Sequence, residues 1–178
     1  MQRTILIFGL IAGAIVSLTM LITMLIHKQN LSSFDDNMVI GYASMLLAAS
    51  MIPVAIKSYR DRHQNGWISF KDAFLMGLGI SLIASLLYVF AWVLIYKNIY
   101  PDFMQNYTRS ALQTMQATGK SAAEIAQAKE EMQAMSAYYD TWWGLIGITF
   151  IEIFPILLIV ALISALVLKR KPQNVVAT

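Results

Sequence analysis

The sequence contains no cysteine and few charged residues, and both absences restrict the kind of protein that it encodes. Without cysteine there is no disulfide bond, thiolate metal site or cysteine nucleophile, and nothing in the chain indicates the redox compartment. Charged residues make up 13% of the 178 residues, whereas apolar residues make up 58%. A soluble domain carries about one quarter charged residues, so this composition predicts an integral membrane protein.

Residue patterns typical of enzymes are also missing. The chain has two histidines and contains no HExxH, GxSxG or GxxxxGK[ST] motif, which would indicate a zinc protease, a serine hydrolase or a phosphate-binding loop. We therefore expect no enzyme activity, no cofactor and no metal site.

Four stretches of the sequence are long and apolar enough to cross a bilayer. A hydrocarbon core of about 30 Å needs about 20 helical residues, and inside lipid the backbone must satisfy its own hydrogen bonds, so each stretch is expected to be a helix. The first stretch is too long for the apolar part of a signal peptide, so we expect it to persist as a span. The predicted spans are residues 4–26, 37–56, 73–96 and 142–168.

The distribution of lysine and arginine predicts the orientation of these spans. Eight lysine and arginine residues lie in the amino terminus, the second connection (57–72) and the basic tail (169–178). The first and third connections hold four, leaving out Lys120, which is far from either neighbouring span. Basic residues favour the cytoplasmic side, so we expect both termini and the 57–72 loop there, with Trp142 and Trp143 at the outer interface. Because the basic residues flank apolar runs, the pI near 9.2 indicates membrane orientation and no nucleic-acid binding.

Residues 101–139 are predicted to form an amphipathic helical hairpin outside the membrane. Pro101 suits the first turn of a helix, where its missing N–H is not needed. Apolar residues recur at helical spacing as far as the break before Gly119, and Ser121 and Glu124 then have the spacing of a capping box. The apolar stripes either pack on each other and on the bundle, or form a methionine-rich seam for a partner or lipid. The expected fold is an all-α polytopic membrane protein, with four transmembrane helices and this hairpin between the third and the fourth.

Several stretches of the chain carry a resemblance that goes beyond hydrophobicity. They include SYRDR followed by NGWISFKDAF, then IYPDFMQNY, ATGKSAAEI and ITFIEIFPILLIV. Over nearly the whole chain, the sequence resembles the bacterial membrane-protein family catalogued as domain of unknown function 4199. The resemblance implies a bacterial inner-membrane protein with four helices, and it brings no established activity. The matching positions are Gly41, Tyr42, Tyr59, Arg60, Asp61, Gly66, Phe70, Phe74, Gly77, Pro101, Gly119, Glu152 and Pro155.

Glu152 is the only charged residue inside the four apolar runs. Thr149 lies one turn before it and Pro155 one turn after it, on the same helical face, so these three residues form a candidate polar site. An unpaired charge in lipid is costly, so we expect a protonated carboxyl that is hydrogen-bonded to a neighbouring hydroxyl. The candidate hydroxyl partners are those of Tyr42, Ser44, Ser85 and Tyr88.

Two further groups of residues are candidates for binding and packing. Basic and aromatic residues of the 57–72 loop either hold anionic lipid headgroups or only set the topology. These residues are Tyr59, Arg60, Arg62 and Trp67. Two ridges of small residues allow close approach of helices, either within one bundle or between two copies. The first ridge is Gly9, Gly13 and Ser17, and the second is Gly77, Ser81 and Ser85.

Two functions fit this sequence. The first is a non-enzymatic helical bundle that acts by binding, either supporting a membrane assembly or sensing the envelope through its outer hairpin. The alternative is a small oligomeric transporter or channel subunit that uses Glu152 and the helix break at Pro155. The expected partners are the lipid bilayer and either another membrane protein or a second copy of the chain. One acid and no base within the membrane favour the first function.

Overall fold

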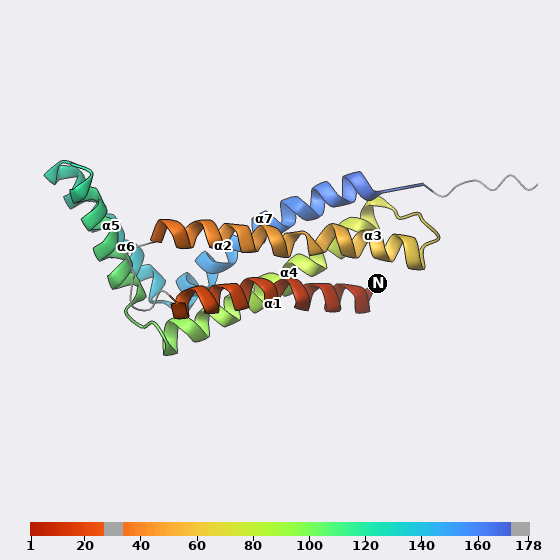
Figure 1. The fold of residues 1–178 in the computed structure, drawn as a ribbon, viewed down its shortest axis with the longest axis horizontal. Coiled ribbons are helices and arrows are strands. Elements are labelled where there is room, and N and C mark those ends of the chain that lie inside the picture. Colours follow the sequence, from red (N-terminus) through yellow and green to blue (C-terminus); the bar gives the residue numbers. More distant parts are fainter. Residues whose placement is uncertain (27–33, 172–178) are drawn as a thin grey trace, which may run out of the picture.

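The computed structural model describes residues 1–26 and 34–171 as seven helices, with no strand in these two ranges (Figure 1). This confirms the predicted all-α class. An isolated backbone bridge joins Ile68 and Arg170. The helices are α1 (Gln2–Ile26), α2 (Phe34–Ala49), α3 (Met51–His63), α4 (Phe70–Asn98), α5 (Phe103–Ala117), α6 (Ala122–Tyr139) and α7 (Trp142–Leu168).

Four segments are long and apolar enough to cross a membrane, as the charge-free runs predict. Helices α1, α4 and α7 each provide one segment, and α2 and α3 together provide the fourth, Val39–His63. The amino terminus, the α3–α4 loop and the end of α7 lie at one end of the bundle, and the α5–α6 hairpin lies at the other (Figure 1). These features indicate a multi-pass membrane protein.

Helix α4 packs most extensively against α1 and α7. Glycines permit close approach on both sides of it. A Cβ added to Gly9 of α1 would lie 2.8 Å from the Cβ of Ile83, and a Cβ added to Gly77 of α4 would lie 2.7 Å from the Cβ of Ala161. Close backbone approach at small residues supplies packing energy where lipid removes the hydrophobic force between helices.

The second apolar run forms two helices, and it extends further than the charge-free run predicts. The two helices meet at Ser50, which keeps helical φ and ψ angles of −61° and −20° and whose hydroxyl donates to a carbonyl of the preceding turn at 2.6 Å. Pro53 lacks the N–H that would continue the helical hydrogen bonds, which accounts for the break. Helix α3 then continues to His63, so the predicted 57–72 loop is reduced to residues 64–69. Lysine and arginine have good helix propensity and carry the helix past its apolar part.

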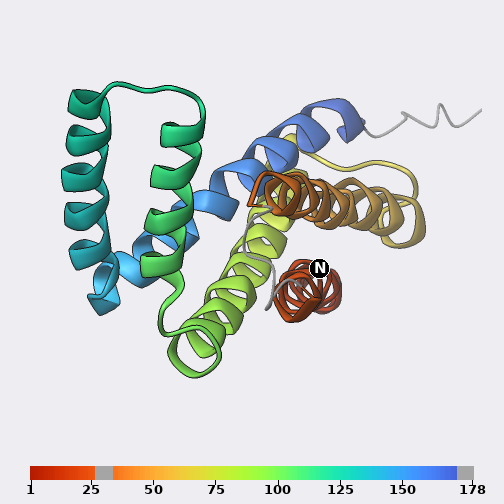
Figure 2. The same cartoon turned by 60° about the vertical axis from the view of Figure 1, so that its left-hand side comes forward.

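Helices α5 and α6 lie side by side as a hairpin (Figure 2). The predicted capping box is present, because the Ser121 hydroxyl accepts from the Glu124 N–H at 3.3 Å and the Glu124 carboxylate accepts from the Ser121 N–H at 2.9 Å. Gly119 has a φ of 75° and reverses the chain between the helices. Helix α5 begins at Phe103, so Pro101 lies in the preceding turn and not in the first helical turn.

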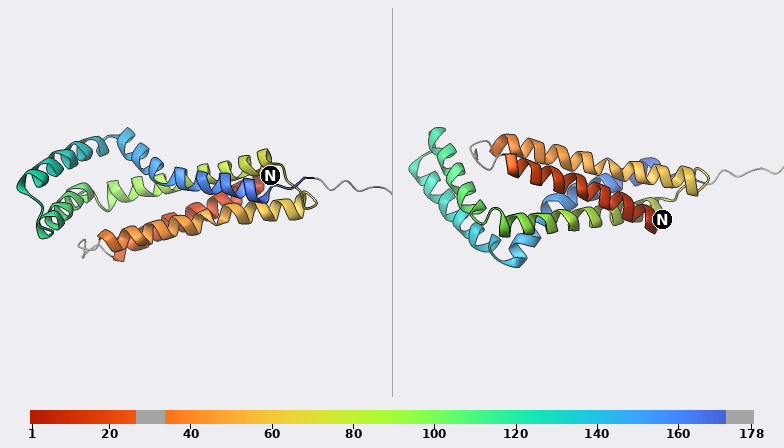
Figure 3. Two further views of the ribbon diagram at one scale, coloured as in Figure 1. Left: turned by 90° about the horizontal axis from the view of Figure 1, so that it is seen from above. Right: turned by 60° about the horizontal axis from the view of Figure 1, so that its bottom comes forward.

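The hairpin is inclined to the bundle, and its base meets the spans (Figure 3). A hydrophobic cluster at this base is distinct from the core of the bundle. The buried members of the cluster are Trp92, Ile95, Tyr96, Tyr100, Met104, Tyr139 and Leu145. The hairpin is therefore attached to the spans by its own apolar contacts.

Candidate functional site

Aromatic side chains fasten the base of the hairpin to the spans. The Trp92 indole N–H donates to the Tyr139 hydroxyl, and the Trp92 ring meets the Phe103 ring edge-on with centroids 4.9 Å apart. The Tyr100 hydroxyl donates to the Met24 carbonyl at the end of α1. Burial raises the pKa of both the Tyr139 and the Tyr100 phenol, so these hydroxyls stay neutral.

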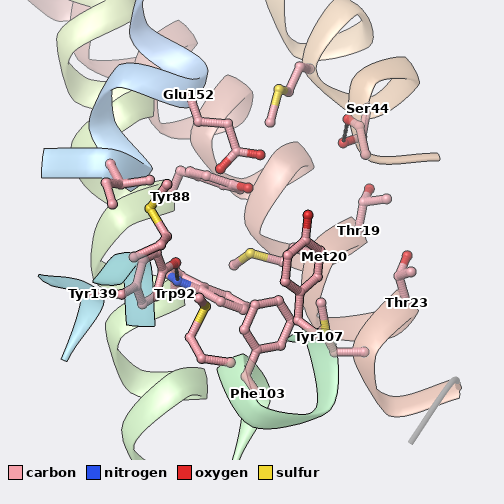
Figure 4. A pocket seen from close by; sticks show the side chains of 16 residues that line it. Thr19, Met20, Thr23, Ser44, Tyr88, Trp92, Phe103, Tyr107, Tyr139 and Glu152 are labelled. Atoms are coloured by element: carbon pink, nitrogen blue, oxygen red, sulfur yellow. Dashed lines mark hydrogen bonds between the residues drawn. The ribbon is translucent and has the colours of Figure 1, made fainter. Parts of the chain in front are cut away.

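Beside this junction the helices surround a pocket of about 400 Å³, which we call the hairpin pocket (Figure 4). Every helix in the described part of the chain except α3 contributes to its wall. Its volume falls within the range of about 300 to 1,000 Å³ that is usual for small-molecule sites. The wall is formed by Thr19, Met20, Thr23, Met24, Gly41, Ser44, Met45, Tyr88, Trp92, Phe103, Met104, Tyr107, Met135, Tyr139, Ile148 and Glu152.

The wall of the hairpin pocket is largely apolar and contains five methionines and five aromatic residues. Methionine side chains adapt to irregular shapes, whereas aromatic rings offer rigid surfaces. Hydroxyls of Thr19, Thr23 and Ser44 add a few polar groups along α1 and α2. At Gly41 the wall is open, because an added Cβ would meet no atom within 4 Å. Such a wall suits an apolar molecule with one polar end.

Among the described wall residues, Glu152 supplies the only charge. Its carboxylate points into the pocket (Figure 4), and among the side chains that the structure describes, those of residues 1–25 and 39–171, none forms an ion pair or hydrogen bond with it. Thr149 is buried and donates to the Leu145 carbonyl at 2.7 Å. Pro155 lies inside α7 and outside the pocket wall. The three predicted residues therefore do not join into one polar site.

The four hydroxyls predicted to bond Glu152 are placed differently from one another. Tyr88 and Ser44 line the same pocket, but the Ser44 hydroxyl donates to a carbonyl of the preceding turn at 2.7 Å. Ser85 is buried and has no hydrogen-bond partner among the described residues, and Tyr42 is exposed and outside the wall. Glu152 thus faces a pocket and is not enclosed by a hydroxyl partner.

The candidate lipid-headgroup residues separate into buried and exposed side chains. Arg60 is only 4% exposed, and its guanidinium donates to the Leu168 carbonyl at 3.2 Å, where it caps the end of α7. Tyr59 is half-buried. Arg62 and Trp67 are exposed, so contact with lipid headgroups stays a prediction for these two.

Both small-residue ridges face other helices of the same chain. A Cβ added to Gly13 would lie 2.7 Å from the Leu87 side chain, as Gly9 lies close to Ile83. The Ser17 hydroxyl has no hydrogen-bond partner in the described part of the chain. The Ser81 hydroxyl donates to the Gly77 carbonyl at 2.9 Å within α4. The ridges are used in α1–α4 and α4–α7 packing.

Sequence reasoning singled out Glu152 and missed the rest of the hairpin pocket. Two signals were present: hydroxyls at Thr19 and Thr23, one turn apart near the end of the first span, and a tryptophan, Trp92, inside the third span. No group of three or more histidine or acidic side chains that would hold a metal ion occurs among the side chains that the structure describes, those of residues 1–25 and 39–171. The site as described is an apolar pocket with one carboxylate.

Comparison with known proteins gives a family match and no relative of known function. The sequence matches a family described as a protein of unknown function (DUF4199) over residues 7–170. This match confirms the resemblance seen in the sequence. No curated protein and no solved structure matches the chain.

Proposed function

This chain belongs to the DUF4199 family of unknown function, and we propose that it is a non-enzymatic membrane bundle that binds a lipid-soluble small molecule in the hairpin pocket. The observation that carries the proposal is a cavity of about 400 Å³ between helices from distant parts of the sequence. Small-molecule sites are clefts or cavities of this size with a largely apolar wall and a few polar groups. A pocket of this kind therefore favours an occupant.

The composition of the wall supports a ligand drawn from the lipid phase. Methionine and aromatic side chains gain dispersion energy and remove apolar surface from water when an apolar molecule fills the space. The few hydroxyls and the single carboxylate of Glu152 provide orientation for one polar group. Neither a nucleophile with a paired base nor a metal cluster is needed for this role.

We infer that the protein lies in the inner membrane of a bacterium, with both termini in the cytoplasm and the hairpin outside. The basic residues Lys169 and Arg170 directly follow α7, whose end lies at the bundle end that also holds the amino terminus (Figure 1). Trp142 and Trp143, both exposed, begin α7 at the hairpin end, where an interfacial belt of aromatic residues fits. The hairpin pocket then lies near the outer leaflet.

Single cysteines at Gln64 and Lys120 test this orientation in a chain that has no cysteine of its own. In intact cells a membrane-impermeant thiol reagent is expected to label position 120 and to spare position 64. Both positions are expected to react after the membrane is permeabilised, which controls for accessibility. Labelling of position 64 alone in intact cells would reverse the orientation.

Filling the pocket at Gly41 tests ligand binding. Leucine at this position begins in open space, so its side chain is expected to occupy the pocket without displacing the helices. The probe is 11-bromoundecanol, whose bromine quenches tryptophan fluorescence on contact. It is added to nanodiscs that contain a variant of the protein in which Trp92 is the only tryptophan. The other tryptophans, replaced by phenylalanine, are the exposed Trp67, Trp142 and Trp143.

The parent is expected to show saturable quenching of Trp92, and Gly41→Leu is expected to weaken it at least about tenfold, equivalent to about 1.4 kcal/mol. The matched control is Gly147→Leu on α7, because an added Cβ there also meets no atom within 4 Å and Gly147 is outside the wall. This control should bind as the parent does. Linear quenching without saturation in the parent, or equal quenching in Gly41→Leu, would overturn the proposed function.

A further inference from the structure

The charge balance of the hairpin pocket distinguishes between classes of lipid-soluble ligand. Among the residues that the structure describes, its wall contains the carboxylate of Glu152 and no lysine, arginine or histidine. We propose that the pocket binds an amphipathic organic cation, a single apolar chain or ring system that carries an amine or quaternary ammonium group, with Glu152 as its counter-ion. This inference rests on the proposed function and specifies its ligand.

The unpaired carboxylate is the first reason. In the described residues no side chain hydrogen-bonds or forms an ion pair with Glu152, although the group faces an apolar pocket (Figure 4). Glu152 is exposed, with an apolar pocket on one side. An ionised carboxylate there is unfavourable unless a partner compensates for lost hydration, so the protonated acid that the sequence predicts is the form favoured without a ligand. A bound cation provides that compensation through a charge-assisted hydrogen bond. A second negative charge next to Glu152 would be repelled, which disfavours fatty acids and other anions.

One cation at this end of the bundle, Lys97, is engaged by aromatic rings away from the pocket. The Lys97 ammonium lies over the rings of Tyr96 and Trp142, with both centroids 5.4 Å away. Neither Lys97 nor either ring partner belongs to the pocket wall. The described part of the wall therefore holds no protein cation that neutralises Glu152, and a cationic ligand would supply a positive charge there.

Aromatic rings next to Glu152 provide the second reason. Figure 4 shows Tyr88 between the Glu152 carboxylate and the cluster of Trp92 and Phe103. The face of an aromatic ring attracts ammonium groups, and the attraction strengthens when the cation leaves water. An ammonium group placed at Glu152 thus has a carboxylate and a ring within the same part of the pocket. The attached apolar body would extend toward Trp92, Phe103 and the neighbouring methionines.

The absence of a cation from the wall also distinguishes single-charged amines from aminophospholipids. A phosphatidylethanolamine headgroup carries an ammonium and a phosphate, and phosphate is held by arginine, lysine or backbone N–H groups. The described wall offers the ammonium a partner in Glu152 and offers the phosphate no cationic side chain. We therefore assign the site to a single-charged amphipathic cation.

Probes that share one apolar chain and differ only in their polar end group test the assignment of the pocket to a cationic ligand. The probes are brominated undecyl chains that end in an amine, an alcohol or a carboxylate, measured by saturable quenching of Trp92 in phosphatidylcholine nanodiscs. The parent is expected to bind the amine at least about tenfold more tightly than the alcohol, and the carboxylate most weakly. In Glu152→Gln the amine and the alcohol are expected to bind alike, because the amide keeps the shape and removes the charge.

The matched control is Glu130→Gln, since Glu130 is an exposed carboxylate on α6 outside the pocket wall. It removes the same charge from the protein and should keep the preference for the amine. Equal binding of amine and alcohol to the parent, or a preference that survives in Glu152→Gln, would overturn this inference while leaving the proposed function intact. Saturable binding of no probe at all would instead overturn both.

Changing the lipid of the nanodisc tests whether the ammonium group comes from a single-charged amine or from a phospholipid headgroup. Replacing part of the phosphatidylcholine with phosphatidylethanolamine is expected to leave the affinity for the amine probe unchanged. A large decrease in affinity would show that the lipid headgroup competes for Glu152, and it would overturn the assignment to a single-charged cation.

Discussion

Replacing Gly144 with alanine is expected to lower the free energy of unfolding by about 3 kcal/mol, the upper end of the usual cost of overpacking. A Cβ at Gly144 would clash with the carbonyl oxygen of Tyr138 and lie 3.0 Å from the hydroxyl oxygen of Thr141. The carbonyl belongs to the backbone, so no side-chain rotation relieves the clash. The Thr141 hydroxyl also caps α7 by accepting from the Gly144 N–H at 3.0 Å. The turn between α6 and α7 would therefore have to open.

Unfolding of the purified protein in detergent, followed by circular dichroism, measures this loss. The matched control is Gly147→Ala, one turn further along α7, where an added Cβ meets no atom within 4 Å. It is expected to be neutral or to stabilise by up to about 1 kcal/mol, because alanine is the better helix former. Equal stability of the two variants would contradict the close contact at the α6–α7 turn.

Replacing Trp92 with alanine is expected to cost about 3 to 5 kcal/mol, the usual range for a large buried aromatic residue. Trp92 is 6% exposed. From α4 it contacts both helices of the hairpin, through the edge-on ring contact with Phe103 and the hydrogen bond to Tyr139. Its removal is therefore expected to release the hairpin while the contacts among α1, α4 and α7 persist.

Hydrogen exchange read by mass spectrometry distinguishes local release from global unfolding. In Trp92→Ala, amides of residues 103–139 are expected to lose protection, and those of α1 and the first half of α4 to keep it. Trp143→Ala is the matched control, because Trp143 is 84% exposed and its loss should change neither region. Unchanged protection of 103–139 in Trp92→Ala would contradict the attachment of the hairpin through this residue.

The four spans are predictable from the sequence because lipid imposes a strong constraint on composition and length. Every apolar run long enough to cross a bilayer corresponds to a helical segment. Their ends are less predictable, because the loss of apolar character does not end a helix. Helix α3 continues to His63 through charged residues, and the break at Ser50 follows from Pro53 rather than from polarity.

Local signals in the connections also predict structure well. Ser121 and Glu124 form the capping box that their spacing indicates. Asn65 and Gly66 have φ values of 49° and 84°, as expected of an Asn-Gly turn. These features depend on residues within a few positions of one another, so the sequence contains everything that determines them.

The hairpin pocket was not predictable, because its wall combines side chains from α1, α2 and α4 to α7 that no local pattern relates. Glu152 was recognisable as an isolated charge, but its surroundings depend on how α2 and the hairpin approach α7. Arg60 shows the same limit: its sequence position indicates a surface residue, whereas tertiary contact with the Leu168 carbonyl turns it inward. Side-chain direction at such positions is decided by packing between distant segments.

Native mass spectrometry of protein released from the membranes of the expressing cells tests ligand binding most directly. The parent protein and Gly147→Leu are expected to carry the same noncovalent adduct with the mass of a small molecule, which collisional activation removes. Gly41→Leu is expected to appear without it, because its added side chain occupies the hairpin pocket. Parent protein without an adduct, or an equal adduct on Gly41→Leu, would contradict ligand binding in this pocket.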